Sequence, residues 1–306
     1  MEQREFIVEQ ETAGQRIDRF LSGEDTGLSR SALQALVAEG HVQCNGKAVA
    51  KSLKLKAGDT VLLEIPDAKP IEAVPQDIPL EIVYEDAHLL VVNKPKGMVV
   101  HPAPGNPDGT LVNALLWHCK GSLSGIGGEI RPGIVHRIDK DTSGLVLAAK
   151  NAYAAPLLAG GVTKLYYAIA QGALPLGEGA IDAPIGRRGD SIIGRCVTPE
   201  GKPSRTEYTI IREENGLSLA ACVPVTGRTH QIRVHFASIG HPLAGDDLYG
   251  GSRERIARQA LHCARQSFAV PVYTPLPDGI RVEMPLQLRT VTVESPLPPD
   301  MEALFS

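Results

Sequence analysis

Hydrophobic residues near the N-terminus recur at helical spacing in two short segments, residues 16–21 and 31–37. Ser29 stands at a helix N-cap position, and Gly40 stands where the second helix should end. Residues 41–46 then alternate in polarity and turn at Asn45-Gly46, and residues 56–65 contain a turn followed by a β-rich run. The pattern predicts a small α/β domain over residues 13–70.

A proline-rich segment follows this domain, with four prolines between Pro66 and Pro79. Such a composition favours an extended, semi-stiff connector, so residues 71–79 are expected to be a linker. Beyond it, apolar runs predict strands at residues 80–84, 89–93, 162–170, 205–211 and 217–223. We therefore expect an α+β protein whose second domain, residues 80–300, is dominated by a sheet.

The composition agrees with two domains and excludes several classes of protein. The 306 residues are 43% hydrophobic and include 31 Gly and 23 Pro, which favours a sheet-rich enzyme. No apolar run approaches the roughly 18 residues that span a bilayer, and no signal peptide is evident, so a cytoplasmic protein is expected. The five cysteines are widely spaced and form no CxxC pair, which predicts reduced and mostly buried thiols.

The net charge of −4 argues against a protein that coats nucleic acid through bulk positive charge. Contacts with RNA would have to come from local patches. Residues 29–56 carry five cations and one acid, and residues 187–212 hold a second excess of cations. On charge alone, the patch at residues 29–56 is equally well an ordinary solvated surface.

The densest group of chemically active residues lies in residues 133–150, where charged and small residues precede an apolar strand. Asp139 is a candidate catalytic carboxylate, or alternatively the cap of a helix or turn. His136 is a candidate general base, but it has no evident fixed partner, which favours a structural histidine.

The segment HRIDKDTSGLVLAAK, residues 136–150, resembles the signature of the pseudouridine synthases that act on large-subunit ribosomal RNA. Further blocks agree in order, and the resemblance extends over residues 13–290, with the D-type large-subunit enzymes as the nearest subgroup. Residues 29–49 with residues 56–59 resemble the small RNA-binding module named after a ribosomal small-subunit protein. The supporting blocks are NKPKGMVVHP from Asn93, KLYYAIAQG from Lys164, GKPSRTEY from Gly201, TGRTHQIRVHFASIGHPLAGDDLYG from Thr226 and RQALHC from Arg258.

The resemblance assigns three residues to the catalytic centre. Asp139 corresponds to the catalytic aspartate, acting as nucleophile or base, and Arg233 to its basic partner. A guanidinium beside a buried carboxylate keeps it ionised and fixes its direction. Tyr166 corresponds to the active-site aromatic residue, with Tyr167 as the alternative.

The resemblance also implies an RNA partner and a mechanism of access. Arg137 is implicated in flipping the target uridine out of the RNA, and Arg30, Lys47 and Lys51 are expected to contact phosphates. The expected substrate is structured RNA, namely 23S ribosomal RNA or its assembling particle. The enzyme is expected to be a monomer that needs no metal or organic cofactor and no membrane. The segment GRRGDSIIGRC departs from the family pattern because it lacks His-Pro after its first Arg.

Two rival functions are considered. A non-catalytic RNA-binding factor of ribosome assembly could keep the same fold, but the complete set of Asp139, Tyr166 and Arg233 argues against it. A hydrolase is disfavoured because GxSxG, HExxH and the Walker loop are all absent from the sequence. A glycosidase would need a second carboxylate opposite Asp139, for which Asp141 is the nearby candidate.

Overall fold

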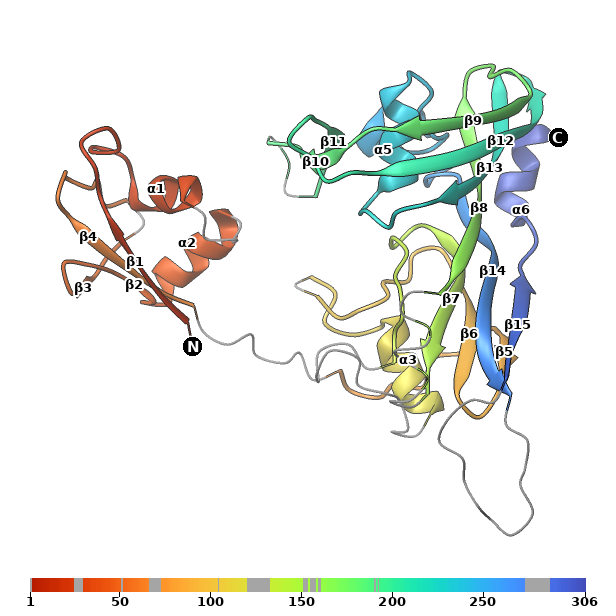
Figure 1. Cartoon of the computed structure of the whole chain (residues 1–306), viewed down its shortest axis with the longest axis horizontal. Helices are drawn as coiled ribbons and strands as arrows, with labels where there is room; N and C mark the ends of the chain where they lie inside the picture. Colours follow the sequence, from red (N-terminus) through yellow and green to blue (C-terminus); the bar gives the residue numbers. More distant parts are fainter. Residues whose placement is uncertain are drawn as a thin grey trace, which may run out of the picture. The chain divides into compact units, whose positions relative to one another are not determined.

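The chain forms two compact units, Met1–Pro70 and Ile71–Ser306, in the computed structural model (Figure 1). The structure describes residues 2–24, 30–50, 52–65, 73–103, 105–119, 133–150, 154, 158, 161–189, 191, 193–272 and 287–306. Ser29, Lys51 and the first two residues of the expected linker lie outside the described residues. Each unit has its own hydrophobic core, so each is described by itself.

The N-terminal unit is a four-stranded sheet in the order β1-β4-β2-β3, with two helices. Strand β1 (Glu2–Ile7) pairs antiparallel with β4 (Thr60–Ile65), so this unit begins before residue 13, where the sequence pattern placed its start. The pattern missed β1 because its side chains are mostly exposed and show no apolar face. The helices α1 (Ile17–Gly23) and α2 (Arg30–Ala38) occur where helical spacing predicted them.

A tight hairpin joins β2 (Val42–Cys44) to β3 (Lys47–Ala48). Asn45 and Gly46 both have positive φ, at 50° and 74°, which is the conformation that a two-residue type I′ turn requires. The turn predicted at Asn45-Gly46 is therefore present. The core beneath the helices is built from fully buried aliphatic side chains, among them Ile17, Leu21, Leu33, Val61 and Leu63.

The second unit is built on one long sheet, whose described strands run in the order β5-β6-β7-β14-β8-β13-β12-β9, with β15 also pairing with β14. The pairing of β7 with β14 is parallel, and the other described pairs of this sheet are antiparallel. A separate hairpin pairs β10 with β11. The strands are β5 (Ile82–Glu85), β6 (Leu89–Lys94), β7 (Ser143–Ala149), β8 (Thr163–Gln171), β9 (Gly177–Asp182), β10 (Ile185–Arg187), β11 (Arg195–Val197), β12 (Arg205–Glu214), β13 (Leu217–Pro224), β14 (Leu261–Val272) and β15 (Gln287–Glu294).

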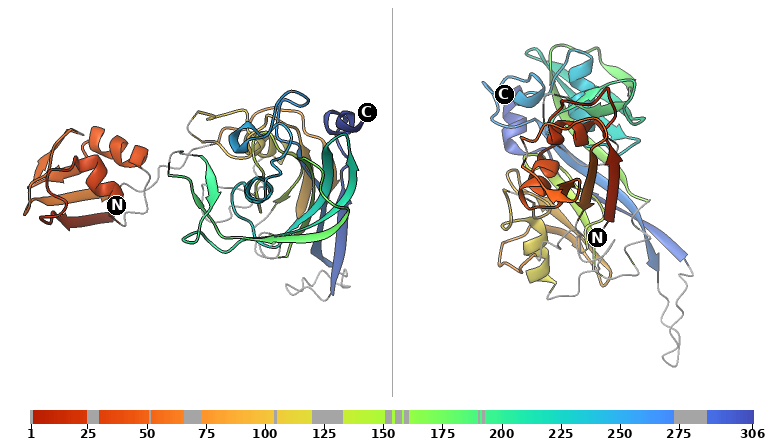
Figure 2. Two further views of the ribbon diagram at one scale, coloured as in Figure 1. Left: turned by 90° about the horizontal axis from the view of Figure 1, so that it is seen from above. Right: turned by 90° about the vertical axis from the view of Figure 1, so that its left-hand side faces the viewer.

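Alternation along β8 separates the two faces of this sheet. Tyr166, Ala168 and Ala170 belong to the main core, together with buried residues of α3 (Leu111–His118) and α5 (Gln231–Ser238). Ile169 and the partly buried Tyr167 belong to a smaller core. That second core is closed by α6 (Pro299–Glu302) and the short helix η3 (Ala303–Phe305). The curved sheet thus has α5 on one side and the C-terminal helices on the other (Figure 2).

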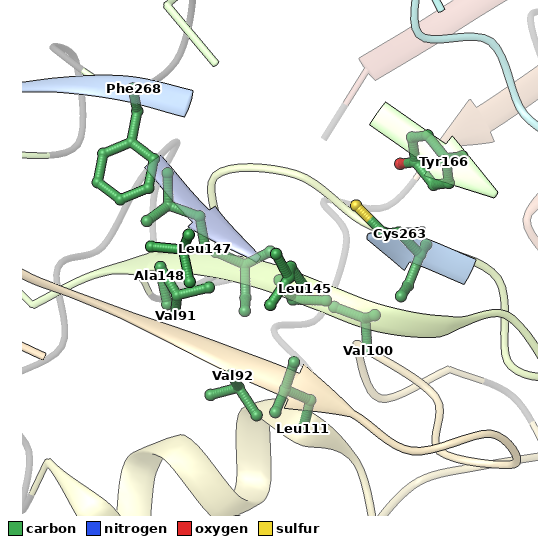
Figure 3. Packing of buried hydrophobic residues seen from close by; sticks show 14 of the residues in the cluster. Val91, Val92, Val100, Leu111, Leu145, Leu147, Ala148, Tyr166, Cys263 and Phe268 are labelled. Atoms are coloured by element: carbon green, nitrogen blue, oxygen red, sulfur yellow. The ribbon is translucent and has the colours of Figure 1, made fainter. Parts of the chain in front are cut away.

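The sequence pattern predicted the sheet-dominated character of this unit correctly. Strands β5, β6, β8, β12 and β13 overlap the five predicted runs. Strand β7 is buried along its whole length, as an apolar strand at the centre of a sheet should be (Figure 3). Four of the five cysteines are buried, and Cys196 is partly buried. No helix within the described residues is long and apolar enough to cross a membrane.

Candidate active site

A pocket of about 700 Å³ lies on the α5 side of the sheet. Its walls come from the loop before β7, from β8, from the end of β13 and from the residues around the start of α5. These segments are far apart in the sequence and meet because β8 lies between β13 and β14 in the sheet. Polar side chains that line the pocket include Arg137, Asp139, Lys164, Tyr166, Arg228 and His230.

The loop that carries Asp139 is held from below by a buried lysine. Lys94 is fully buried, and its Nζ donates hydrogen bonds to the carbonyl oxygens of Pro95, Met98 and Lys140 at 2.8, 2.8 and 2.9 Å. Burial lowers the pKa of Lys94 to about 7, although the nearby charges of Asp141 and Asp139 oppose this change. Because Lys140 follows Asp139 directly, the hydrogen bond from Lys94 to the Lys140 carbonyl fixes the backbone next to Asp139.

Asp139 and Arg233 form an ion pair at the pocket. The Arg233 Nη1 donates to Asp139 Oδ2 at 2.9 Å, and the two side chains are only 7% and 20% exposed. His230 Nε2 lies 3.6 Å from the other carboxylate oxygen, Oδ1. The carboxylate is therefore sheltered and oriented by a cation, as the sequence-based assignment of these two residues required.

The guanidinium of Arg233 is itself fixed by Asp246. Nε and Nη2 of Arg233 donate to the two Asp246 oxygens at 2.7 and 2.8 Å, and the Asp246 side chain is fully buried. Burial by itself lowers the pKa of Arg233, but the hydrogen bonds and charges of Asp246 and Asp139 outweigh it and raise the pKa above its ordinary value. Arg233 is consequently a permanent cation. Gly245 has φ of 75°, and a Cβ there would lie 1.9 Å from the Arg258 carbonyl oxygen, so the turn that presents Asp246 requires glycine.

Tyr249 and His230 extend this network. The Arg233 guanidinium lies beside the Tyr249 ring, with Cζ 5.1 Å from the ring centroid. The Tyr249 hydroxyl is 2.7 Å from His230 Nδ1. The backbone N–H of Arg195 in β11 donates to that hydroxyl at 3.0 Å. His230 precedes α5 with a φ of 58°, which is uncommon for a residue other than glycine and concentrates at functional sites. Burial lowers the pKa of His230, which favours its neutral form.

Tyr166, rather than Tyr167, faces the pocket. Tyr166 is 8% exposed and lies beside Cys263, its partner across the β8–β14 pair (Figure 3). Burial, followed by the charge and hydrogen bond of Cys263, raises the pKa of Tyr166 well above its ordinary value, so its phenol stays protonated. Tyr167 packs on the opposite face of the sheet against the smaller core. Of the two tyrosines, Tyr166 is therefore the one that lines the pocket.

The expected RNA-contacting residues are placed less completely. Arg137 is exposed and lines the pocket. Lys47 is exposed on β3, and Arg30 begins α2, but the Arg30 side chain is outside what the structure describes, as is all of Lys51. In the second cationic segment, Arg205 pairs with Glu207, so not every cation there is available to phosphate.

Comparison with known proteins decides the family. Residues 88–238 match the family described as RNA pseudouridylate synthase, and residues 15–61 match the S4 domain. The chain is 43% identical to the ribosomal large subunit pseudouridine synthase D of Zymomonas mobilis, over 100% of this chain and 97% of that protein. The chain belongs to the RNA pseudouridylate synthase family. It is an RNA pseudouridine synthase with an N-terminal S4 RNA-binding domain.

Other pseudouridine synthases are similar in sequence and in fold. An uncharacterised RNA pseudouridine synthase of Bacillus subtilis is 42% identical over 100% of this chain and 98% of its own length. Among solved structures, the human RNA pseudouridylate synthase domain containing 1 aligns with a TM-score of 0.56 and 26% identity, covering 79% of this chain and 91% of that one. The resemblances that the sequence motifs predicted, to this synthase family and to the small RNA-binding module, are both confirmed.

Sequence reasoning left four residues of this site without a role: His230, which lines the pocket, and Lys94, Asp246 and Tyr249, which hold its residues from behind. Each lies inside a block that carried the resemblance, but no local spacing links it to Asp139. A second acidic partner such as Asp246 could have been anticipated on one physical ground. A buried arginine that donates to one carboxylate through a single nitrogen still needs acceptors for its other N–H groups. Within the described residues, no group of three or more His, Cys, Asp or Glu side chains is arranged to hold a metal ion.

Proposed function

We propose that this RNA pseudouridine synthase isomerises specific uridines of 23S ribosomal RNA, with Asp139 as the nucleophile or base that acts on a flipped-out nucleotide. The observation that carries the proposal is the sheltered Asp139 carboxylate, hydrogen-bonded to Arg233 at 2.9 Å on the wall of a pocket of about 700 Å³. The choice of substrate is supported by the Zymomonas mobilis relative, which is named for the ribosomal large subunit.

The reaction needs one carboxylate in two capacities. The bond between C1′ of the ribose and N1 of uracil breaks, the detached base turns, and C1′ bonds to C5. The proton of C5 is lost and N1 gains one, so the atoms balance without an oxidant or a co-reactant. An ionised Asp139 can attack the sugar or abstract a proton, and later accept the C5 proton. Arg233 stabilises the ionised form and aims it.

The uridine must leave its stack before it can reach Asp139. Extrusion costs about a few kcal/mol, and this cost must be offset by contacts made inside the enzyme. The ring face of Tyr166 offers an apolar surface for the uracil, and its phenol stays protonated. The exposed guanidinium of Arg137, which is also on the pocket wall, can stack on a base and hold a phosphate at once.

The S4 domain supplies the second contact with RNA. Arg30 begins α2 and Lys47 lies in β3. The proposal assigns these two residues and Lys51 phosphate contacts that position the RNA without reading its sequence. Selection of structured ribosomal RNA then combines two weak interactions, one at each unit. With ribosomal RNA as the substrate, the enzyme would act in the cytoplasm.

The substitution Asp139→Asn tests the mechanism. With transcribed 23S ribosomal RNA, we expect the wild-type enzyme to form pseudouridine and the variant to form none, while the affinity for RNA measured by filter binding changes little. The product RNA should be uncleaved and unchanged in mass, because an isomerase releases nothing. Measurable turnover by the variant would rule out the role of Asp139. Release of free uracil would indicate a glycosidase, and binding by the wild type without any product would indicate a non-catalytic assembly factor.

A further inference from the structure

His136 lies three residues before Asp139 on the same pocket wall, outside the network of Asp139, Arg233 and Asp246. One of its ring nitrogens is firmly held by the protein. Nε2 of His136 is 3.2 Å from the backbone N–H of Leu147 and 2.9 Å from the amide nitrogen of Gln266. Both contacts come from strands of the central sheet, β7 and β14, so the ring is anchored to the rigid part of the unit.

These two contacts determine which nitrogen carries the proton. A backbone N–H can only donate, so Nε2 of His136 must accept from Leu147. The Gln266 amide nitrogen also donates to the Leu145 carbonyl at 2.7 Å, which fixes the orientation of that amide and makes it a second donor to Nε2. The ring proton is therefore on Nδ1. Burial, together with the charge of Lys164, lowers the pKa of His136 to about 3, so the ring is neutral at physiological pH.

The Nδ1–H of His136 is left without an acceptor. The atom is excluded from solvent, and within the described part of the chain nothing accepts its proton. Buried donors in folded proteins are nearly always paired, and an exception in a pocket indicates a group that a ligand completes. His136 lines the pocket that holds Asp139, and its Nδ1–H, covered in the free enzyme, is an oriented, neutral donor that the described residues leave unpaired.

A cation lies on the same side of the pocket. Lys164 in β8 is directly opposite Gln266 in β14, so both side chains leave the same face of the sheet as His136. Lys164 lines the pocket two residues before Tyr166. Among the described lining residues Asp139 is the single acid, so this side of the pocket offers donors and positive charge and would attract an oxygen.

We propose that the Nδ1–H of His136, with the ammonium group of Lys164 beside it, binds an acceptor oxygen of the target nucleotide. The inference rests on the proposed function and adds a binding subsite to it. The oxygen belongs either to a uracil carbonyl or to the phosphate of the nucleotide, since both accept hydrogen bonds from a neutral imidazole and both are attracted by an ammonium group. A carbonyl oxygen at C4 would also let the enzyme distinguish uracil from cytosine, which carries an amino donor there.

Two isosteric substitutions separate this role from a structural one. In His136→Asn the side-chain amide can place a donor where Nδ1 stood, but it cannot reach Leu147 and Gln266. In His136→Gln the longer amide can accept from Leu147 and Gln266, but it loses the donor to the pocket. We expect kcat/KM on transcribed 23S ribosomal RNA to be about ten- to a hundredfold lower for His136→Gln than for His136→Asn. The midpoint of unfolding in urea should show the opposite order.

The comparison of the two variants has a clear contrary outcome. A histidine that only supports the pocket wall would give the same order in activity and in stability, with His136→Gln the better enzyme, and that result would overturn the inference. If the wild type itself forms no pseudouridine, the proposed function fails instead. The two failures are therefore distinguishable.

Nitrogen-15 NMR of labelled histidine identifies the oxygen. In the free enzyme, we expect the His136 ring to show a protonated Nδ1, and a protonated Nε2 would overturn the inference. Uridine, uridine 5′-monophosphate and ribose 5-phosphate are then titrated separately, with the amide signal of Gly227 on the pocket wall as the control for occupancy. A shift of Nδ1 with uridine assigns a base carbonyl, and a shift with ribose 5-phosphate assigns the phosphate. If the Gly227 amide signal shifts and the His136 Nδ1 signal does not, the subsite is contradicted. If neither signal shifts with any of the three compounds, the proposed pocket is contradicted.

Discussion

Arg233 and Asp246 form a two-point ion pair in which Nε and Nη2 of the guanidinium donate to the two carboxylate oxygens at 2.7 and 2.8 Å. The Asp246 side chain is fully buried and that of Arg233 is 7% exposed. With Nε and Nη2 occupied, Nη1 is the nitrogen that reaches Asp139. Asp246 therefore sets the direction from which the Arg233 guanidinium meets the Asp139 carboxylate.

We predict that Asp246→Asn lowers both stability and turnover. The amide can keep one of the two hydrogen bonds, but it leaves the buried guanidinium with one carboxylate in place of two. Breaking a buried pair in this way costs about 3–5 kcal/mol of unfolding free energy. Because Nη1 is then free to shift, we expect kcat on ribosomal RNA to fall by about a hundredfold. Urea unfolding and single-turnover assays measure the two effects.

The neighbouring Asp247 provides the matched control for this prediction. Its side chain is 58% exposed and pairs with Arg253, which is 57% exposed, at 2.8 Å. Exposed pairs of this kind contribute about 0–1 kcal/mol, so Asp247→Asn should leave stability and kcat nearly unchanged. Equal effects of the two substitutions would show that the Arg233–Asp246 pair has no special role.

A second prediction concerns the aromatic wall of the pocket. The Tyr166 hydroxyl has a thiol, Cys263, as its hydrogen-bonding partner, and thiols bond weakly. Tyr166→Phe should therefore keep kcat within about tenfold of the wild type. Tyr166→Leu removes the flat face that stacks on uracil and should cost a further factor of about ten or more. Steady-state rates on one RNA substrate test the order, and a Phe variant no better than Leu would show that the hydroxyl, rather than the ring, is needed.

The sequence predicted the fold class, most strands and the partnership of Asp139 with Arg233, because each depends on local periodicity or on family motifs. It could not predict how the loop of Asp139 is held, since Lys94 lies 46 residues before Lys140, whose carbonyl it binds. It assigned His136 no fixed partner for the same reason. Gln266 is 130 residues away, and the Leu147 contact is a backbone amide that no residue pattern displays. Spatial neighbours across a sheet become visible only when strand order is known.

A third prediction is a loss of stability in mild acid. Burial lowers the pKa of His136 to about 3 and that of His262 to about 4, whereas both rise to about 6.5 on unfolding. Since the unfolded state takes up these protons first, stability is complete above about pH 6.5 and is lost as the pH falls toward about 4. Within that window, each histidine can lower the free energy of unfolding by up to about 1.4 kcal/mol for each pH unit of acidification.

Urea unfolding at several pH values measures this slope directly. Trp117 is the single tryptophan of the chain and lies in α3, so its fluorescence reports on the second unit. Replacing His262 by Gln should remove about half of the slope, because one of the two histidines no longer titrates. A free energy of unfolding that stays constant between about pH 6.5 and 4.5 would contradict the assignment of these two rings as neutral.

The last prediction is that the catalytic unit folds without the S4 domain but selects RNA less well. The described strands of the first unit form one sheet among themselves, and its described core is made of residues of this unit. The core of the second unit likewise draws on residues from 73 onward. Removing residues 1–70 should therefore leave the midpoint of urea unfolding, followed by Trp117 fluorescence, unchanged from the full chain within experimental error.

The phosphate contacts of the S4 domain would be lost by the same deletion, so KM for 23S ribosomal RNA should rise by about ten- to a hundredfold while kcat is retained. Lys47→Glu in the full chain should weaken binding in the same direction by a smaller factor, because it reverses one exposed charge and leaves the fold intact. Unchanged KM after the deletion would mean that the catalytic unit alone recognises the RNA.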